Sequence, residues 1–122
     1  MERTEFLDAV IDKDIKKVKR LIKGGININQ SDRNGWDALH FAAQNNDVEI
    51  GRLLIDNGIN IENKDKYGNT PLLRATFASK GYGGFIKMLL DEGADRDIKN
   101  NNGVSPLILA ERIGNYDVKQ FF

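Results

Sequence analysis

The residues that could do chemistry are few, and His40 stands first because it is the only histidine in the chain. A catalytic triad or a zinc site needs partners, and one histidine without any cysteine cannot supply the usual ligand sets. A catalytic base at His40 would have only scattered carboxylates to work with. The sequence therefore predicts no enzyme activity, no catalytic residue, no metal site and no cofactor.

Two other patterns resemble chemical sites only in part. Asp12 and Asp14, like Asp95 and Asp97, are close carboxylates, but they fall in predicted loops, where such residues usually cap helices and solvate turns. The glycine-rich stretch 81–84 could suggest a phosphate-binding loop. However, no strand precedes it and the Lys-Ser/Thr pair of a P-loop is missing. We therefore expect neither a nucleotide ligand nor a small-molecule substrate.

Composition excludes further classes of protein. The chain has 18 basic and 18 acidic residues, whereas a nucleic-acid-binding protein usually has a basic excess. No stretch approaches the ~20 apolar residues of a membrane span. The acidic N-terminus carries no apolar run typical of a signal peptide. With no cysteine in the chain, these features predict a cytoplasmic protein that binds neither nucleic acid nor membrane.

The elements that must position these residues follow an internal repeat. Gly35 recurs as Gly68 and Gly103, at steps of 33 and 35 residues, and Leu39 and Ala42 recur in the same register. Each turn glycine is followed by two apolar runs with helical spacing, and short alternating segments lie between these helix pairs. A fixed period near 33 residues indicates stacked repeats that share one continuous core.

Local signals mark where the helices begin. A hydroxyl or carboxylate side chain precedes each apolar run that opens a pair, and in two pairs a proline follows at the first helical position. Helices are predicted over 5–12 and from Ile15 to the glycines at 24–25. The predicted capping residues are Thr4, Asp14, Asp37, Thr70 and Ser105.

The first unit differs from the others on one face. Lys17 occupies the position of Ile50, Phe85 and Val118, and Arg20 occupies that of Leu53, Met88 and Phe121. Polar residues in place of packing residues indicate a solvated outer surface, so the first unit is predicted to be an N-terminal cap.

This pattern resembles the ankyrin repeat. The stretches that match its Gly turn, Thr-Pro-Leu-His opening and Leu-Leu-x-x-Gly ending run over 32–58, 65–93 and 100–122, with a degenerate first repeat over 4–25. The tetratricopeptide repeat has a similar period but lacks the Gly turn and the Thr-Pro-Leu opening. Two departures stand out: Gly51 lies inside a helix where the pattern has a β-branched residue, and the third unit has an insertion over 76–84, expected to loosen its turn.

The resemblance implies an all-α, ankyrin-repeat solenoid of stacked helix-turn-helix units with short β-hairpin loops. One domain over 1–122 would hold repeats at about 4–30, 31–63, 64–99 and 100–122, the first and last acting as caps. It also implies that His40 is structural and forms hydrogen bonds near the start of its helix.

Ankyrin stacks bind partners through a concave surface built from loop tips and first helices. Trp36, directly after a turn glycine, is the anchor we favour, because exposed aromatic residues bury a large area at low entropic cost; packing over the loop base is its alternative. Tyr67, Phe77 and Tyr82 would continue an aromatic strip, although Phe77 could instead lie in the core. The resemblance implies these partner-binding residues: Arg33, Asn34, Trp36, Gln44, Asn45, Lys66, Tyr67, Asn69, Phe77, Tyr82, Asn102 and Arg112.

The leading hypothesis is a non-enzymatic module that binds another protein through this concave surface. Arg33, Lys66, Arg74 and Arg112 favour a partner with an acidic surface. A narrower hypothesis is a bacterial inhibitor or immunity protein of a toxin-like enzyme. The alternative is a structural fragment of a longer ankyrin array or a self-associating scaffold, because Phe121 and Phe122 close the sequence without a polar cap.

Overall fold

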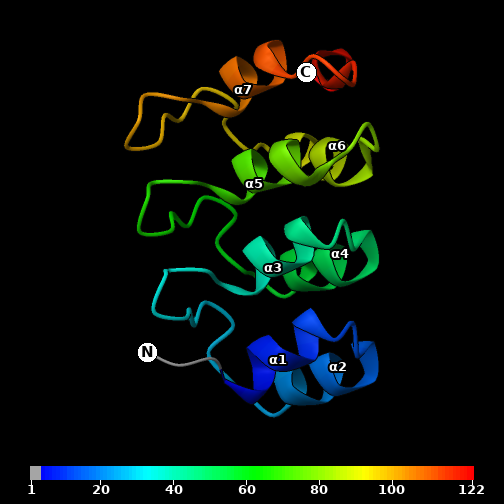
Figure 1. Ribbon diagram of the computed structural model, residues 1–122. Coiled ribbons are helices and arrows are strands. Elements are labelled where there is room, and N and C mark those ends of the chain that lie inside the picture. Colours follow the sequence, from blue (N-terminus) through cyan, green and yellow to red (C-terminus); the bar gives the residue numbers. More distant parts are fainter. Residues whose placement is uncertain (1–3) are drawn as a thin grey trace.

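The computed structural model describes residues 4–122, which form four units stacked in one direction (Figure 1). Three units are pairs of α-helices, and the fourth combines an α-helix with a short 3-10 helix. The elements are α1 (Glu5–Ile11), α2 (Ile15–Lys23), α3 (Ala38–Gln44), α4 (Val48–Asp56), α5 (Pro71–Ala78), α6 (Gly84–Asp91), α7 (Pro106–Arg112) and the 3-10 helix η1 (Val118–Phe121). The all-α solenoid predicted from the sequence is confirmed.

The two helices of each pair form separate rows along the stack. The first helix of each pair contacts those of its neighbours in the order α1, α3, α5, α7, and the second helices contact one another in the order α2, α4, α6. The connecting loops project to one side of the helices, on the left in Figure 1. Within residues 4–122 these loops contain no strand, and their antiparallel pairing is limited to a bridge between Ser31 and Asp37.

Side-chain caps fix where the helices begin. Each predicted capping residue accepts a hydrogen bond from the backbone N–H three residues later, as Thr4 does from Leu7 at 3.3 Å and Ser105 from Ile108 at 3.1 Å. The other three predicted caps behave alike. Helix α6 has no such side-chain cap, because Gly83 precedes it.

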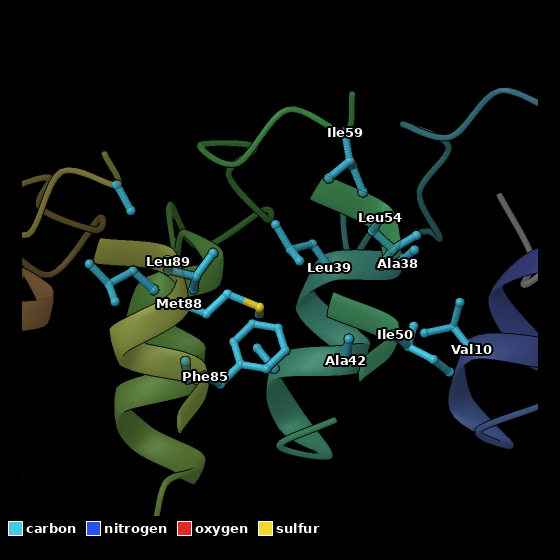
Figure 2. Packing of buried hydrophobic residues seen from close by; sticks show 14 of the residues in the cluster. Val10, Ala38, Leu39, Ala42, Ile50, Leu54, Ile59, Phe85, Met88 and Leu89 are labelled. Atoms are coloured by element: carbon cyan, nitrogen blue, oxygen red, sulfur yellow. The ribbon is translucent and has the colours of Figure 1, made fainter. Parts of the chain in front are cut away.

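The core runs between the two rows and is continuous along the stack. Figure 2 shows Phe85 and Met88 pointing from α6 toward the second pair, and Val10 from α1 beside Ile50 of α4. Ile50, Phe85 and Val118, which share one register, are each 1% exposed, whereas Lys17 in the same register is half-buried and Arg20 is exposed. The first pair therefore carries a polar outer face, as its sequence predicts.

Gly51 is a packing feature rather than a simple defect in α4. A Cβ placed on it would lie 2.6 Å from both Met88 Cε and a ring carbon of Phe85. The absence of a side chain thus lets α6 approach α4. The departure from the repeat pattern at Gly51 therefore has a packing reason, because Phe85 and Met88 already fill the space.

The insertion in the third unit forms a defined turn. Residues 79–83 join α5 to α6, whereas residues 45–47 suffice between α3 and α4. The Ser79 hydroxyl donates to the Thr76 carbonyl at 3.1 Å, and the Tyr82 N–H donates to the Ser79 carbonyl at 2.9 Å. Gly81 takes a φ of +88°, which glycine adopts without strain. The turn is longer than its counterpart but is held by its own hydrogen bonds.

Candidate functional site

The loops are tied into a row by hydrogen bonds within and between them. In each, one Asp or Asn side chain accepts two backbone N–H groups; Asp65 Oδ1, for example, accepts those of Tyr67 and Asn69, both at 2.9 Å. Successive tips are joined as Lys66 N–H donates to the Asn34 carbonyl and Asn101 N–H donates to the Tyr67 carbonyl, both at 2.9 Å. The tips therefore form a fixed row beside the first helices. This row and the exposed side of α3, α5 and α7 are called the concave face below.

His40 is fully buried and holds the second and third units together. Its Nδ1 lies 2.8 Å from Asp37 Oδ1, and its Nε2 lies 2.9 Å from the Asn69 carbonyl oxygen. A longer contact of 3.5 Å joins the Asp37 N–H to Nδ1 and suits only a neutral ring. Burial lowers the pKa of His40, but the hydrogen bond and charge of Asp37 and the Asn69 carbonyl outweigh it and raise the pKa above its ordinary value.

The structural role that the resemblance implies for His40 is confirmed by this geometry. Its two short contacts are both with oxygen acceptors, which a doubly protonated ring satisfies. With no exposed surface, the ring cannot reach a substrate. Among residues 4–122, no group of three or more His, Asp or Glu side chains is placed to hold a metal ion.

Trp36 packs over the base of its loop. It is half-buried, its Nε1 donates to Asp65 Oδ2 at 3.1 Å, and its ring centroid lies 5.0 Å from that of Phe41 and 5.9 Å from that of His40. This is the alternative that the sequence left open for Trp36: the Asp65 carboxylate of the next loop and two rings of α3 hold the indole over the loop base. Its part in binding a partner stays a prediction.

Arg74, a residue of α5, lies close to two aromatic rings. Its guanidinium carbon is 4.8 Å from the ring centroid of Trp36 and 5.2 Å from that of Phe77, so the cation bridges the second and third units. Its buried Nε has no hydrogen-bond partner, and no carboxylate of residues 4–122 lies within ion-pair distance of the group. Burial lowers the pKa of Arg74, and the Asp65 charge offsets part of that effect.

Phe77 is the most prominent apolar side chain of the first helices, at 63% exposed. A hollow of about 300 Å³ lies between Phe77 and the fourth unit, where Leu109, Ile113, Tyr116 and Val118 make it largely apolar. A second hollow of about 320 Å³ lies toward the second unit, and its lining is richer in polar groups: Gln44, Asn45, Asn46, Ser79, Lys80 and Tyr82 join Phe77 and Ala78. Phe77 thus separates two recesses of different chemistry.

The structure brings some of the predicted site residues together and separates others. Gln44, Asn45, Phe77 and Tyr82 line one hollow, and Arg74 links Phe77 to Trp36. Tyr67 lies instead at a loop tip, with Lys66 Nζ 5.2 Å from its ring centroid, and lines neither hollow beside Phe77. The predicted aromatic strip is therefore interrupted. The exposed members of the predicted set are Arg33, Asn34, Gln44, Lys66, Tyr67, Phe77, Tyr82, Asn102 and Arg112.

Asn69 was predicted at an exposed tip, and this prediction is wrong. Its exposed fraction is 8%, its amide nitrogen donates to Asp65 Oδ2 at 3.3 Å, and its amide oxygen accepts from Asn100 at 2.9 Å. It occupies the register of Trp36 and links its own loop to the next loop and to His40 of α3. Asn45 is half-buried for a similar reason, because its amide nitrogen donates to the Ile11 carbonyl at 3.2 Å.

One residue that lines the site, Tyr116, is not predicted from the sequence. Ile113 and Tyr116 follow α7 and line the apolar hollow, and Tyr116 is 46% exposed. The repeat register does predict Ile113 at this surface, because it matches Ala78 of the previous unit. Tyr116 has no such signal, since the chain after Arg112 leaves the helical pattern.

Comparison with known proteins decides the family. The family described as ankyrin repeats (3 copies) matches residues 6–100. The chain belongs to the ankyrin-repeat family. It is 34% identical over 102 residues to protein phosphatase 1 regulatory subunit 27 of Mus musculus, a match that covers 83% of this chain and 65% of the relative.

A second relative is far longer than this ankyrin-repeat chain. Neurogenic locus notch homolog protein 1 of Danio rerio is 32% identical over 107 residues, which cover 87% of this chain and 4% of the relative. The chain therefore spans less than two thirds of the regulatory subunit and a small part of the notch homolog. No helix in residues 4–122 has the length and hydrophobicity needed to span a membrane.

Proposed function

We propose that this ankyrin-repeat chain is a non-enzymatic module that binds another protein through its concave face. The observation that carries the proposal is Phe77, a phenylalanine of α5 that is 63% exposed and lies between two recesses. Large aromatic residues at the centre of a recessed surface are typical anchors of protein interfaces. Tyr67, exposed at a loop tip, and Tyr82, exposed in the turn after α5, offer further contacts.

Nothing in the site favours chemistry over binding. The one histidine is fully buried and engaged on both ring nitrogens, so it supports a scaffold role. The family as a whole mediates protein–protein contacts, and one relative is named a regulatory subunit. We therefore propose that the chain acts by occupying or positioning its partner, with no small-molecule substrate. Its cytoplasmic location stays a prediction from composition.

The test is capture of partners from the cells that produce the protein, with wild type and a Tyr67→Ala/Phe77→Ala variant compared quantitatively. Both residues are exposed, so the variant is expected to fold. Glu49→Ala, an exposed change on a second helix, is the matched control. We expect partners held by wild type and the control to be lost from the double variant. Equal capture by all three proteins would contradict the concave face as the binding surface.

One purified candidate can be tested directly. Because a relative is named as a regulatory subunit of protein phosphatase 1, that phosphatase is a rational first partner, although the match covers 65% of the relative. The narrower role as an inhibitor or immunity protein of a toxin-like enzyme stays a hypothesis, since neither relative's name mentions such an enzyme. Light scattering that shows a stable dimer would favour the self-associating scaffold instead.

A further inference from the structure

Arg74 is held in position without a counter-ion. An arginine is protonated throughout the physiological range, and stacking between Trp36 and Phe77 restricts this one to few conformations. Arg52 and Lys119, by contrast, form ion pairs with Glu92 and Glu111. Within residues 4–122 the nearest charge that favours the cation is Asp65, whose carboxylate is instead bonded to Trp36. Arg74 is thus a preorganised cation whose N–H donors are available to a carboxylate of a partner.

The surroundings of Phe77 carry further unpaired cations. Lys80 lines both hollows beside Phe77, and Arg112 lies on α7 in register with Phe77. Neither forms an ion pair with any carboxylate of residues 4–122. Lys80 is thus the charged residue in the lining of the apolar recess, and Arg74 adds a second cation beside Phe77.

The apolar recess lies beside the cation. Phe77 contacts the guanidinium of Arg74 and also lines the hollow formed with Leu109, Ile113 and Tyr116. A ligand that covers Phe77 would reach both the cation and the hollow. The polar and apolar groups of such a ligand must then be separated by about the width of the Phe77 ring.

We propose that this surface binds an extended protein segment that carries an acidic side chain and a large apolar side chain two residues apart. The carboxylate pairs with the Arg74 guanidinium, and the apolar side chain enters the hollow between Phe77 and Tyr116. Alternate side chains of an extended segment point the same way and lie ~6.6 Å apart, which matches the span of one phenyl ring. This inference rests on the proposed function and defines the chemistry of its partner.

Several physical arguments favour such a segment. Guanidinium and carboxylate form two parallel hydrogen bonds, and Arg74 is already half-buried against the two rings. Because Arg74 is fixed before binding, less side-chain entropy is lost. A nucleic acid could use the same cation, but the hollow is lined mainly by aliphatic and aromatic carbon, which suits a leucine or phenylalanine better than a sugar-phosphate chain.

The test is selection of random dodecapeptides displayed on phage against the full-length protein. We expect enriched sequences to carry Asp or Glu two positions from Leu, Ile, Phe or Trp. The dissociation constant of the leading peptide should rise at least ~10-fold in Arg74→Gln and in Phe77→Ala, and remain unchanged in Arg20→Gln, an exposed arginine on α2. Arg74→Lys should recover part of the affinity, because it keeps the charge but loses the planar stack.

The outcomes separate this inference from the proposed function. Peptides without acidic enrichment, or peptides that bind Arg74→Gln as tightly as wild type, overturn the inference. If such peptides still bind Tyr67→Ala/Phe77→Ala more weakly than wild type, the concave-face proposal survives. Peptides unaffected by every concave-face substitution contradict both. A library that yields no binder also overturns the inference. Thermal unfolding of each variant, monitored by circular dichroism, separates lost contacts from lost structure.

Discussion

At the residue scale, Asp37 shows how one side chain can organise a repeat. It is 1% exposed; its Oδ1 accepts the His40 backbone N–H at 2.9 Å and faces His40 Nδ1 at 2.8 Å, while its Oδ2 accepts from Asn63 at 2.8 Å. The same carboxylate thus caps α3, orients the histidine and contacts the next loop. Removing either Asp37 or His40 leaves a buried polar partner unsatisfied.

The first prediction concerns pH. Folding raises the pKa of His40 above 6.5, so in the window above 6.5 the folded chain retains a proton that the unfolded chain has released. Stability linked to His40 is therefore complete below about pH 6.5 and is lost as the pH rises through the folded-state pKa. Melting temperatures measured between pH 5.5 and 8.5 should fall over that window.

His40→Gln supplies the control for that measurement. It should be less stable by about 1–3 kcal/mol, because the Asp37 carboxylate loses a buried partner, and its melting temperature should vary less with pH. The single histidine also allows its ring protons to be followed by NMR without assignment. A histidine pKa at or below 6.5, or equal pH slopes in both proteins, would contradict the argument.

The second prediction separates two asparagines that look alike in sequence. Asn69→Ala removes buried hydrogen bonds to Asp65 and Asn100 and should lower the free energy of unfolding by about 1–3 kcal/mol. Asn102→Ala changes an exposed side chain and should be nearly neutral. Chemical denaturation measures both. Equal stabilities would mean that Asn69 does not link the loops as described.

At the element scale, α4 and α6 fit together because α4 lacks a side chain at Gly51. Helix propensity alone predicts that Gly51→Ala stabilises α4 by roughly 1 kcal/mol. Packing predicts the reverse, because the new methyl carbon would lie 2.6 Å from atoms of Phe85 and Met88. Overpacking in a filled core costs about 1–3 kcal/mol, so packing wins.

The third prediction follows from that comparison. Gly51→Ala should lower the melting temperature, and Gly51→Val should lower it further. In a Met88→Ala background, part of the penalty for Gly51→Ala should disappear, since one of the two obstructing side chains is gone. A double-mutant cycle of denaturation curves measures this coupling. A more stable Gly51→Ala protein would show that α6 moves away at little cost.

What the sequence predicts well at this scale is local. The caps at Thr4, Asp14 and Ser105 act on residues three positions away, so their effect is visible in a short stretch. The packing of Trp36, Asn69 and Gly51 is not visible in a short stretch, because the partners that decide it lie about one repeat further along the chain. The repeat register identifies such positions as equivalent, but it does not show which side chain fills the space between them.

At the scale of the whole molecule, the stack depends on each unit covering its neighbour. Buried Ile50, Phe85 and Val118 make the contacts between second helices, while Lys17 and Arg20 keep the corresponding face of α2 polar. In a repeat protein, stability is roughly the sum of the units and their interfaces, so an uncovered apolar face favours association.

The fourth prediction is that Lys17→Ile/Arg20→Leu turns the outer face of α2 into an associating surface. The variant should sediment faster with increasing concentration than wild type does, because it gains an apolar patch that matches the interior register. Lys19→Ile, a nearby exposed change outside that register, is the control. Identical sedimentation of all three proteins would show that these two positions do not form the outer packing surface.

The central claim is that the concave face around Phe77 binds a partner protein. It is tested most directly by titrating the first partner identified with wild type, Phe77→Ala and the control Glu49→Ala, all with similar melting temperatures. We predict that Phe77→Ala weakens binding by about 1–2 kcal/mol or more, roughly 5–30-fold, whereas Glu49→Ala binds as wild type does. An unchanged affinity for Phe77→Ala would place the interface elsewhere and contradict the account.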